Sequence, residues 1–401
     1  MKRGLRMLET VREKREWTQV KFGDVVRKVA NRVEPEESEL ERYVAGEHME
    51  TDDLRVRRWG TIGADYLGPA FHMRFKPGQV LYGSRRTYLR KVSVPHFEGV
   101  TANTTFVLEP KDPNVLQSEL LPFIMQTPSF HAHSIGQSKG SVNPYINFSD
   151  IAWYEFRLPP QKEQRRIAEV FRALLEEREA LRQLRIRLKS VAEAYLEARQ
   201  RMFDDALSSV GDLLSEPPRN GISPSASSED SGLWTVSISS VRDGIFEPEG
   251  NRRTADVDRE RASPFFVQRG DVFVVRGNGN RSLCGKAGIA EDSYEDLFYP
   301  DLLIRLRFDP STILPEFAVA QWNLPSVHRR LSARAKSSNG IWKVNGNDIR
   351  RHRLVVPPRR TQEIILAEVR EIEHALRHVR GREDDSAQLY RLFLELIDPQ
   401  S

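Results

Sequence analysis

Several short motifs carry residue types that perform catalysis in other proteins. Gly136–Gly140 has the G-x-S-x-G spacing of a nucleophile elbow, in which an exposed serine attacks an acyl carbon. That motif needs a strand before the serine and a helix after it, whereas Asn143 and Pro144 follow at once and prevent a helix. The motif therefore does not predict a hydrolase.

A second group of motifs is similar to nucleotide-binding and methyltransferase signatures. The glycine-rich stretch Arg276–Arg281 has Ser282 where the dinucleotide-binding motif requires a third glycine. Asn143-Pro144-Tyr145 is similar to the Asn-Pro-Pro-Tyr that holds a flipped adenine, but one proline is missing and no glycine-rich cofactor motif is evident. A self-contained DNA methyltransferase stays open only as an alternative.

Metal ligands are not predicted either. His374 and His378 stand four residues apart, a spacing that zinc ligands use, but no third ligand is evident and a solvated helix face is the simpler interpretation. Cys284 is the only cysteine, which excludes an intramolecular disulfide and any cysteine-pair zinc site. The sequence predicts no catalytic residue, no metal and no cofactor in this chain.

Polar loops after predicted strands offer chemistry suited to nucleic acid instead. Arginine can donate to guanine, asparagine can pair with adenine, and lysine, serine, threonine and tyrosine can hold phosphates. The alternative for each loop is an ordinary polar turn. The predicted DNA-binding residues are Ser84, Arg85, Arg86, Tyr88, Lys139, Ser141 and Asn143 in the first half, and Arg276, Asn278, Asn280, Arg281, Lys336, Asn339 and Lys343 in the second.

The length and composition of the chain limit the class of protein to which these loops can belong. The 401 residues allow two or three domains, and the 29% charged and 39% apolar residues are typical of neither a disordered tail nor a membrane protein. The net charge of +4 is too small to prove a nucleic-acid partner, although residues 158–203 hold 11 basic and seven acidic side chains. The basic start at residues 1–6 lacks a following apolar run, so we expect no secretory signal and a cytoplasmic location.

The second half of the chain repeats the first at an offset that grows from 188 to 199 residues. No single match is strong, but the matches occur in one order, which chance rarely produces. Corresponding segments include Phe22–Val26 with Val210–Leu214, Lys76–Leu81 with Gln268–Phe273, Asn147–Ile151 with Asn345–Ile349, and Leu158–Pro160 with Val356–Pro358.

Each copy combines a mixed domain with a long helix. Strand-like runs occur at Val80–Tyr82, Thr105–Leu108, Val272–Val275 and Leu302–Leu306. Short helices are predicted over Glu119–Gln126 and Glu316–Trp322, because each run ends shortly before a proline. The segment Ser215–Gly232, rich in serine and proline, predicts a mobile loop within the second domain.

The two long helices follow a proline pair and carry apolar residues at alternating steps of three and four. This heptad pattern predicts that the helices pair with each other as an antiparallel coiled coil; the alternative is that each packs only on its own domain. The predicted helix-pairing residues are Leu174, Leu181, Leu184, Leu188, Val369, Ile372, Leu376 and Val379.

This ordered set of motifs resembles the specificity subunit of Type I restriction-modification systems. The resemblance covers nearly the whole chain and rests on Leu158–Ile167 at the start of the first helix, on Arg219–Pro224 and Val236–Ser239, and on Ser138–Asn147. The second copy departs from it, because Val356–Gln362 lacks the Glu-Gln-Arg core, so the second helix is expected to pack differently.

The resemblance implies an α+β fold with two repeated mixed α/β target-recognition domains joined by two long antiparallel coiled-coil helices. The implied boundaries are 1–157 and 206–357 for the recognition domains and 158–205 and 358–401 for the helical spacers.

The resemblance also implies a noncatalytic subunit that gives a phage-defence complex its split double-stranded DNA target. Each recognition domain would recognise one half-site, and the helices would set the spacer. Two DNA methyltransferase subunits and the restriction and translocase subunits are the implied partners, with S-adenosylmethionine, ATP and magnesium only in those partners and no membrane contact. A coiled-coil adaptor that binds only proteins is the other alternative.

Overall fold

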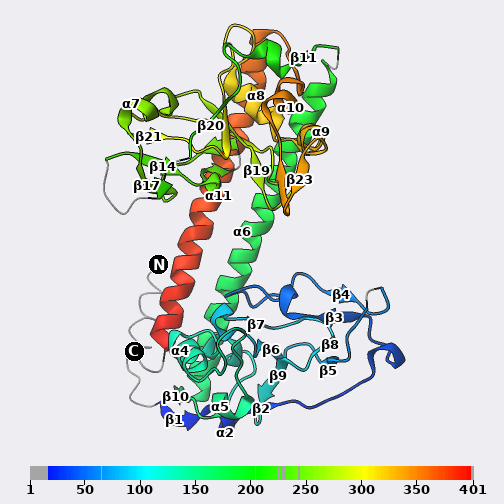
Figure 1. The fold of residues 1–401 in the computed structure, drawn as a ribbon. Coiled ribbons are helices and arrows are strands. Elements are labelled where there is room, and N and C mark those ends of the chain that lie inside the picture. The colour runs from blue at the N-terminus through cyan, green and yellow to red at the C-terminus, as the bar shows by residue number, and fades with distance from the viewer. Residues whose placement is uncertain are drawn as a thin grey trace. The chain divides into compact units, whose positions relative to one another are not determined.

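The computed structural model describes residues 17–64, 66–203, 205–223, 225–226, 232–242 and 244–398 (Figure 1). The chain forms two compact units: unit 1 comprises residues 1–182 and 381–401, and unit 2 comprises residues 183–380. The two long helices, α6 (Gln161–Arg201) and α11 (Arg359–Ile397), each contribute one part to each unit. Each unit therefore combines chain segments from both repeats.

Unit 1 contains two four-stranded sheets, β2-β9-β6-β7 and β4-β3-β8-β5, and a short pair, β1-β10. Helices α2, α3, α4 and α5 and the 3-10 helices η2, η3 and η4 connect these strands. The elements are β1 (Thr18–Lys21), α2 (Phe22–Val25), β2 (Val26–Lys28), η2 (Pro35–Glu37), β3 (Arg42–Val44), η3 (Gly46–His48), β4 (Gly60–Thr61), β5 (Phe71–Phe75), β6 (Val80–Gly83), η4 (Thr87–Leu89), β7 (Val92–Ser93), β8 (Gly99–Ala102), β9 (Thr105–Pro110), α3 (Leu121–Ile124), α4 (Pro128–Gly136), α5 (Phe148–Ala152) and β10 (Glu155–Leu158).

Unit 2 contains a six-stranded sheet, β12-β22-β18-β20-β16-β15, and the smaller sheets β13-β17-β14-β21, β19-β24-β23 and β11-β25. The elements are β11 (Leu207–Ser209), η5 (Val210–Leu213), β12 (Arg219–Asn220), β13 (Ser225–Ala226), β14 (Trp234–Val236), η6 (Ile238–Ser240), β15 (Val241–Arg242), β16 (Gly244–Phe246), β17 (Arg252–Asp256), α7 (Arg259–Ala262), η7 (Ser263–Phe265), β18 (Val272–Val275), β19 (Gly277–Asn278), β20 (Ala287–Ala290), β21 (Leu297–Phe298), β22 (Leu303–Leu306), α8 (Pro315–Trp322), α9 (Pro325–Ser332), β23 (Lys336–Ser338), β24 (Ile341–Lys343), α10 (Gly346–Arg350) and β25 (Arg353–Val355).

The structure confirms the internal repeat. The antiparallel pairs β1-β10 and β6-β9 of unit 1 correspond to β11-β25 and β18-β22 of unit 2. Helices α4 and α5 correspond to α9 and α10, and Asn147 and Asn345 form the same capping arrangement before α5 and α10. The four predicted strand-like runs and both short helices are present at their predicted places. The chain boundaries given above for the recognition domains and spacers remain predictions.

A buried glutamine fixes the start of each long helix. Gln164 Oε1 accepts from the Gln117 backbone N–H at 2.9 Å, and its Nε2 donates to the Pro159 carbonyl at 2.9 Å. Gln362 makes the same pair of bonds, to Leu314 N at 2.8 Å and to Pro357 O at 2.9 Å. The start of α11 therefore repeats this glutamine contact of α6, while the expectation that the second helix packs differently remains a prediction.

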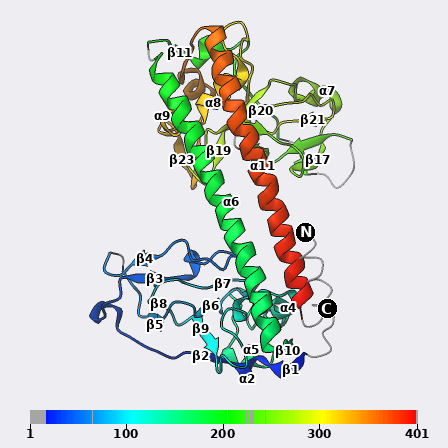
Figure 2. The same cartoon turned by 180° about the vertical axis from the view of Figure 1, so that it is seen from behind.

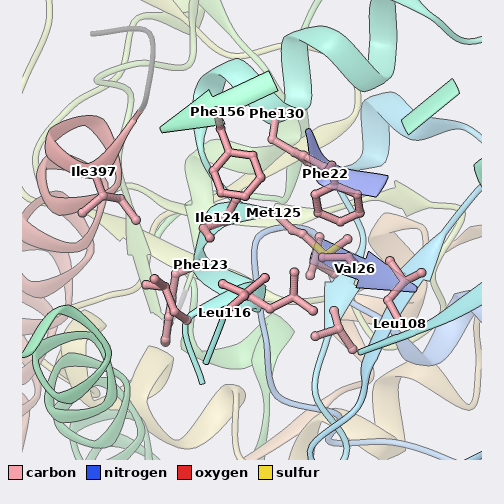
Figure 3. Close-up of a cluster of buried hydrophobic side chains, with 14 of the residues drawn as sticks. Phe22, Val26, Leu108, Leu116, Phe123, Ile124, Met125, Phe130, Phe156 and Ile397 are labelled. Atoms are coloured by element: carbon pink, nitrogen blue, oxygen red, sulfur yellow. The ribbon is translucent and has the colours of Figure 1, made fainter. Parts of the chain in front are cut away.

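The apolar core of unit 1 includes residues from both long helices. Phe123 stacks on Phe171 of α6 with ring centroids 4.4 Å apart, and Phe171 lies 5.4 Å from Tyr390 of α11. Figure 3 shows Ile397 of α11 beside Phe123 in the cluster that extends to Phe22 and Phe130. In unit 2, Leu196 of α6 and Ile365 of α11 likewise belong to one core. Figures 1 and 2 show the two helix segments of each unit running side by side.

Pro128 and Pro325 are the first residues of helices α4 and α9. The sequence predicted short helices that stop before Pro128 and Pro325, and α4 and α9 start at these residues. Proline suits the first turn of a helix because its missing N–H has no partner there. The segment Ser215–Gly232 is only partly the loop that we predicted, because Arg219–Asn220 pairs with β22 and Ser225–Ala226 pairs with β17. Residues 224 and 227–231 lie outside the described residues.

Two buried histidines make the stability of the fold sensitive to acid. His131 on α4 is 7% exposed and His352 before β25 is 2% exposed. Burial, together with nearby arginines, lowers the pKa of His131 to about 4 and that of His352 to about 3. Both folded-state values lie below the value of about 6.5 in an unfolded chain, so these groups stabilise the fold fully above that pH and lose the contribution as the pH falls.

We expect each of these histidines to cost about 2 kcal/mol of unfolding free energy between pH 7 and pH 5. Denaturant titrations at both pH values check this for the parent chain and for His352→Gln, which cannot take up the proton. The loss should be smaller in the variant by about 2 kcal/mol. Equal losses in both proteins would contradict the assignment.

Among the described residues, no helix combines the length and the apolar character that crossing a membrane requires. Cys284 is a buried free thiol.

Candidate nucleic-acid interface

In unit 1 the two predicted polar loops contact each other. Arg85 and Lys139 both form bridges to Tyr145, and the Arg86 backbone N–H donates to the Pro144 carbonyl at 2.6 Å. The Arg85 guanidinium lies over the Tyr145 ring, 5.0 Å from its centroid. The turn after β6 and the loop after α4 therefore form one surface, which we call surface 1 and define as residues 84–88 and 139–145.

Most predicted residues of surface 1 are exposed. Arg85, Arg86, Ser141 and Asn143 are exposed, and Tyr88 is 52% exposed. Burial and the charge of neighbouring arginines, Arg86 first among them, lower the pKa of the Lys91 ammonium. The exposed Arg85 and Arg86 side chains place positive charge on this turn, which suits an anionic partner.

Two residues of surface 1 have other partners. Ser84 is 5% exposed and its hydroxyl donates to the Thr104 carbonyl at 2.7 Å, so the prediction of a DNA contact is wrong for Ser84. Its neighbouring backbone groups hold the turn in place. Lys139 Nζ forms an ion pair with Asp150 Oδ2 at 2.9 Å, and this bond lowers the pKa of the Asp150 carboxyl. Lys139 would have to exchange this partner for a phosphate.

In unit 2 the corresponding loops form the three-stranded sheet β19-β24-β23. Gly277 lies opposite Lys343, and Lys343 lies opposite Lys336. Asn339 has φ +50° and Gly340 has φ +75°, as a tight hairpin between β23 and β24 requires. The register matches the Arg85–Tyr145–Lys139 bridges of unit 1, so the same construction occurs in both repeats. We call residues 276–281 and 336–343 surface 2.

Two exposed lysines face each other on surface 2. Lys336 and Lys343 are a direct cross-strand pair, and like charges in that position destabilise a sheet. An anion bound between them would relieve the repulsion. Arg281 lies over the Trp342 ring at 4.6 Å, as Arg85 lies over Tyr145 in unit 1.

The asparagines of surface 2 use their oxygens within the loop. Asn278 Oδ1 accepts from the Asn280 N–H at 2.8 Å, while Asn280 Oδ1 accepts from both the N–H and the hydroxyl of Ser282. Adenine recognition by asparagine needs the amide oxygen as an acceptor as well as the amide N–H. In this conformation Asn280 cannot offer that oxygen. Arg276 is half-buried and donates to the Asp301 carbonyl at 3.2 Å.

The sequence missed the aromatic residues that support both surfaces. Tyr145 and Trp342 each lie beneath an arginine guanidinium, although the register places Lys343, the neighbour of Trp342, at the position of Tyr145. Their signal was an aromatic residue within the second loop of each repeat, five residues after Gly140 and two residues after Gly340. Val142, at the end of the surface 1 loop, is 93% exposed and was also not predicted.

The predicted helix-pairing residues differ in burial. Leu174, Val369 and Val379 are buried, at 7%, 3% and 7% exposure. A second set is half-buried: Leu181, Leu188, Ile372 and Leu376. Leu184 is 45% exposed, so the apolar seam is not closed at that position.

The helix segments run antiparallel within each unit. In unit 1, Phe171 contacts Phe393 and Glu177 pairs with Arg382 at 2.7 Å. In unit 2, Arg199 pairs with Glu368 at 3.3 Å.

No group of three or more histidine, cysteine or acidic side chains able to hold a metal ion occurs within the described ranges. The rings of His374 and His378 lie 4.6 Å apart on α11, and both side chains are exposed. The G-x-S-x-G stretch follows helix α4 rather than a strand, so it lacks the geometry of a nucleophile elbow.

Residues 14–190 match the family model of the Type I restriction modification DNA specificity domain. The Type I restriction enzyme EcoKI specificity subunit of Escherichia coli (strain K12) is 28% identical over 155 residues. That alignment covers 38% of this chain and 33% of the length of the relative.

Two solved structures share the fold over nearly the full chain. The Type I restriction-modification S subunit from M. genitalium superposes with a TM-score of 0.54 at 12% identity, covering 96% of each chain. A chain from a study of complex assembly and conformational transition of the type I R-M system has a TM-score of 0.51 at 16% identity, covering 95% of this chain and 97% of that one. At these identities the likeness shows the fold alone.

Proposed function

We propose that this chain, whose residues 14–190 match the family model of the Type I restriction modification DNA specificity domain, is the noncatalytic DNA-recognition subunit of a restriction-modification complex. One observation carries the proposal: a basic turn and a basic loop pair with each other in unit 1, and the same backbone pairing recurs in unit 2. Two such surfaces on one chain suit a double-stranded target with two separate half-sites.

Each surface would contact one half-site. The Lys336–Lys343 pair would bind phosphates, since backbone contacts position a protein on the duplex. The guanidinium groups of Arg85 and Arg281, oriented by their aromatic neighbours, would donate to guanine edges in the major groove. The antiparallel helices α6 and α11 would set the distance between the two half-sites.

Catalysis would then belong to partner subunits. Two DNA methyltransferase subunits would hold S-adenosylmethionine, and the restriction and translocase subunits would hold ATP and magnesium. The adenine to be methylated would leave the duplex and enter the methyltransferase.

The test is selection from random duplexes by the full chain together with its modification subunits. The expected result is two short specified sequences separated by an unspecified spacer of fixed length, with affinity that falls steeply as salt rises. Absence of DNA binding at any salt concentration would favour the protein-only adaptor. Methylation by the chain alone would favour the complete methyltransferase.

Lys343→Ala gives a more local test. We expect lower affinity for all sequences and a salt slope reduced by about 1, because one phosphate contact is lost. Lys162→Ala is the matched control, since it removes an exposed lysine at the start of α6, far along the chain from surface 2. Identical salt slopes for the two variants would place Lys343 away from DNA.

A further inference from the structure

The segment of residues 49–57 crosses unit 1 between η3 and β4. Met49 and Val56 are buried in one apolar cluster of the unit, and Leu54 is buried in another. The Leu54 carbonyl accepts from the Val94 N–H at 2.7 Å. This segment is anchored in both clusters. A shift at one of its ends is therefore expected to move the residues that contact its other end.

One end of the segment contacts Leu89 and Arg90, which directly follow the first part of surface 1. The Thr51 hydroxyl donates to the Leu89 carbonyl at 2.9 Å, and the Asp52 carboxylate pairs with Arg90. Arg86 and Arg90, on either side of η4, have φ of +49° and +47°, and Asp52 has φ of +55°. Such backbone conformations cost free energy in residues other than glycine and persist only where their surroundings impose them. The contacts from Thr51 and Asp52 supply part of that constraint.

The other end of the segment is bonded to α6. Arg57 Nη2 pairs with Glu179 Oε2 at 2.7 Å and also with Asp53, and Arg55 Nη2 donates to the Leu175 carbonyl at 3.4 Å. The Arg57 and Glu179 side chains are only 19% and 20% exposed. An ion pair so far removed from water is directional and is screened less by salt than an exposed pair.

We propose that Arg57 and Glu179 are positioning residues that fix the direction in which surface 1 faces DNA relative to α6. The inference rests on the proposed function and adds to it the residues that hold one recognition surface in register with the helix. The apolar contacts around Phe171 hold the unit together but set direction weakly, because apolar packing is not directional. The Arg57–Glu179 bond supplies the direction.

Unit 2 uses a different bond between its recognition half and α6. There the Gln200 amide of α6 donates to Gln321 of α8 at 3.0 Å, a neutral pair. The effect of removing the charged pair is therefore expected for the half-site of unit 1 and not for the other.

The first experiment measures spacer selectivity with Glu179→Ala in the full chain and its modification subunits. The probes are duplexes that carry both selected half-sites with the native spacer or with one base pair more or fewer. We expect the preference for the native spacer to fall about tenfold, equivalent to about 1.4 kcal/mol, with unchanged base preference in each half-site. Glu179→Gln keeps an oxygen for Arg57 and should fall in between, while the exposed Glu176→Ala is the matched control.

Two outcomes of this experiment would overturn the proposal. An equal loss of affinity at every spacer length would mean that Glu179 only stabilises the fold. Changed base preference would mean that it acts on recognition itself.

A second experiment needs no DNA, so it separates this inference from the proposed function. Spin labels at Tyr88→Cys and Arg172→Cys report the distance between surface 1 and α6, since the native Cys284 is buried and both label sites are exposed. The distribution of distances should broaden in Glu179→Ala and stay narrow in Glu176→Ala. An unchanged distribution would overturn the positioning role even if split-target binding is confirmed. If the parent chain selects no split target but the distribution broadens, the proposed function fails while the mechanical role of the pair stands.

Discussion

Glu216→Ala is expected to lower the unfolding free energy of unit 2 by about 1–3 kcal/mol, because a buried arginine loses its partner while Glu216 itself is 37% exposed. Arg305 lies on β22 with its side chain 3% exposed, and its Nη2 pairs with Glu216 Oε1 at 3.1 Å. Its other guanidinium contacts are the Pro264 carbonyl at 3.3 Å and the Tyr299 ring. Without Glu216, a charge enclosed by protein loses its counterion, which costs more than the loss of an exposed ion pair.

A matched control is available in unit 1. Glu109→Ala breaks a shorter ion pair, Arg27–Glu109 at 2.6 Å, but Arg27 is 59% exposed and recovers water. The expected cost there is about 0–1 kcal/mol. Val107 occupies in β9 the place that Arg305 occupies in β22, opposite Leu81 and Phe273 respectively. Arg305→Leu combined with Glu216→Ala should therefore recover much of the stability. Denaturant titrations of the parent chain and the three variants measure the unfolding free energies. Similar losses for Glu216→Ala and Glu109→Ala would contradict this explanation.

Removal of one heptad from each long helix is expected to change the DNA spacer or abolish specific binding. Residues 184–190 of α6 and 371–377 of α11 lie along their helices between the partners of the Arg199–Glu368 pair and those of the Glu177–Arg382 pair. Deleting both segments shortens each helix by about 10.5 Å and keeps the heptad register. This length corresponds to about three base pairs of DNA. A spacer shorter by about three base pairs also rotates one half-site by about 100° about the duplex axis.

Affinity for the original target should then fall towards the non-specific level, about a thousandfold or more. A target with a spacer shorter by about three base pairs is the one that the shortened chain could still bind. Replacing the same residues with unrelated heptads of equal length is the control, and it should leave the spacer unchanged. A folded, assembled deletion variant that keeps its affinity for the original spacer would show that the helices do not set the distance.

The repeat, the long helices and their starting residues could be predicted from the sequence because each has a local signal. Proline pairs, heptad spacing and matched short motifs need no knowledge of tertiary contacts. The two loops of each surface were predicted separately, but their meeting around Tyr145 and Trp342 was not, because it depends on strand register. The same limit explains Ser84, whose hydroxyl looks available in the sequence and donates to Thr104 in the fold.

Heptad spacing also overstated the seam between the helices. Leu184 and Val191 continue the pattern, yet they are 45% and 55% exposed, while Leu196, which the pattern did not include, is buried at 6%. The helix ends are buried because each packs against a globular half as well as against the other helix. The spacing of apolar residues along one helix does not reveal the globular half against which the end of that helix packs. The positions of Arg57 and Glu179, 122 residues apart, had no local signal at all.

The core of each unit is closed by a helix end from the other repeat: Tyr390, Leu394 and Ile397 complete unit 1, and Leu196 completes unit 2. Two separate chains built this way would have to associate before either core could close, and a pair of identical chains would impose two-fold symmetry on whatever they bind. Joining the repeats in one polypeptide replaces that encounter with an intramolecular one at high effective concentration. It also frees the two copies to diverge, as Val107 and Arg305 have done. A fused chain can thus evolve towards an asymmetric target, one half at a time, without losing the partner that completes its fold.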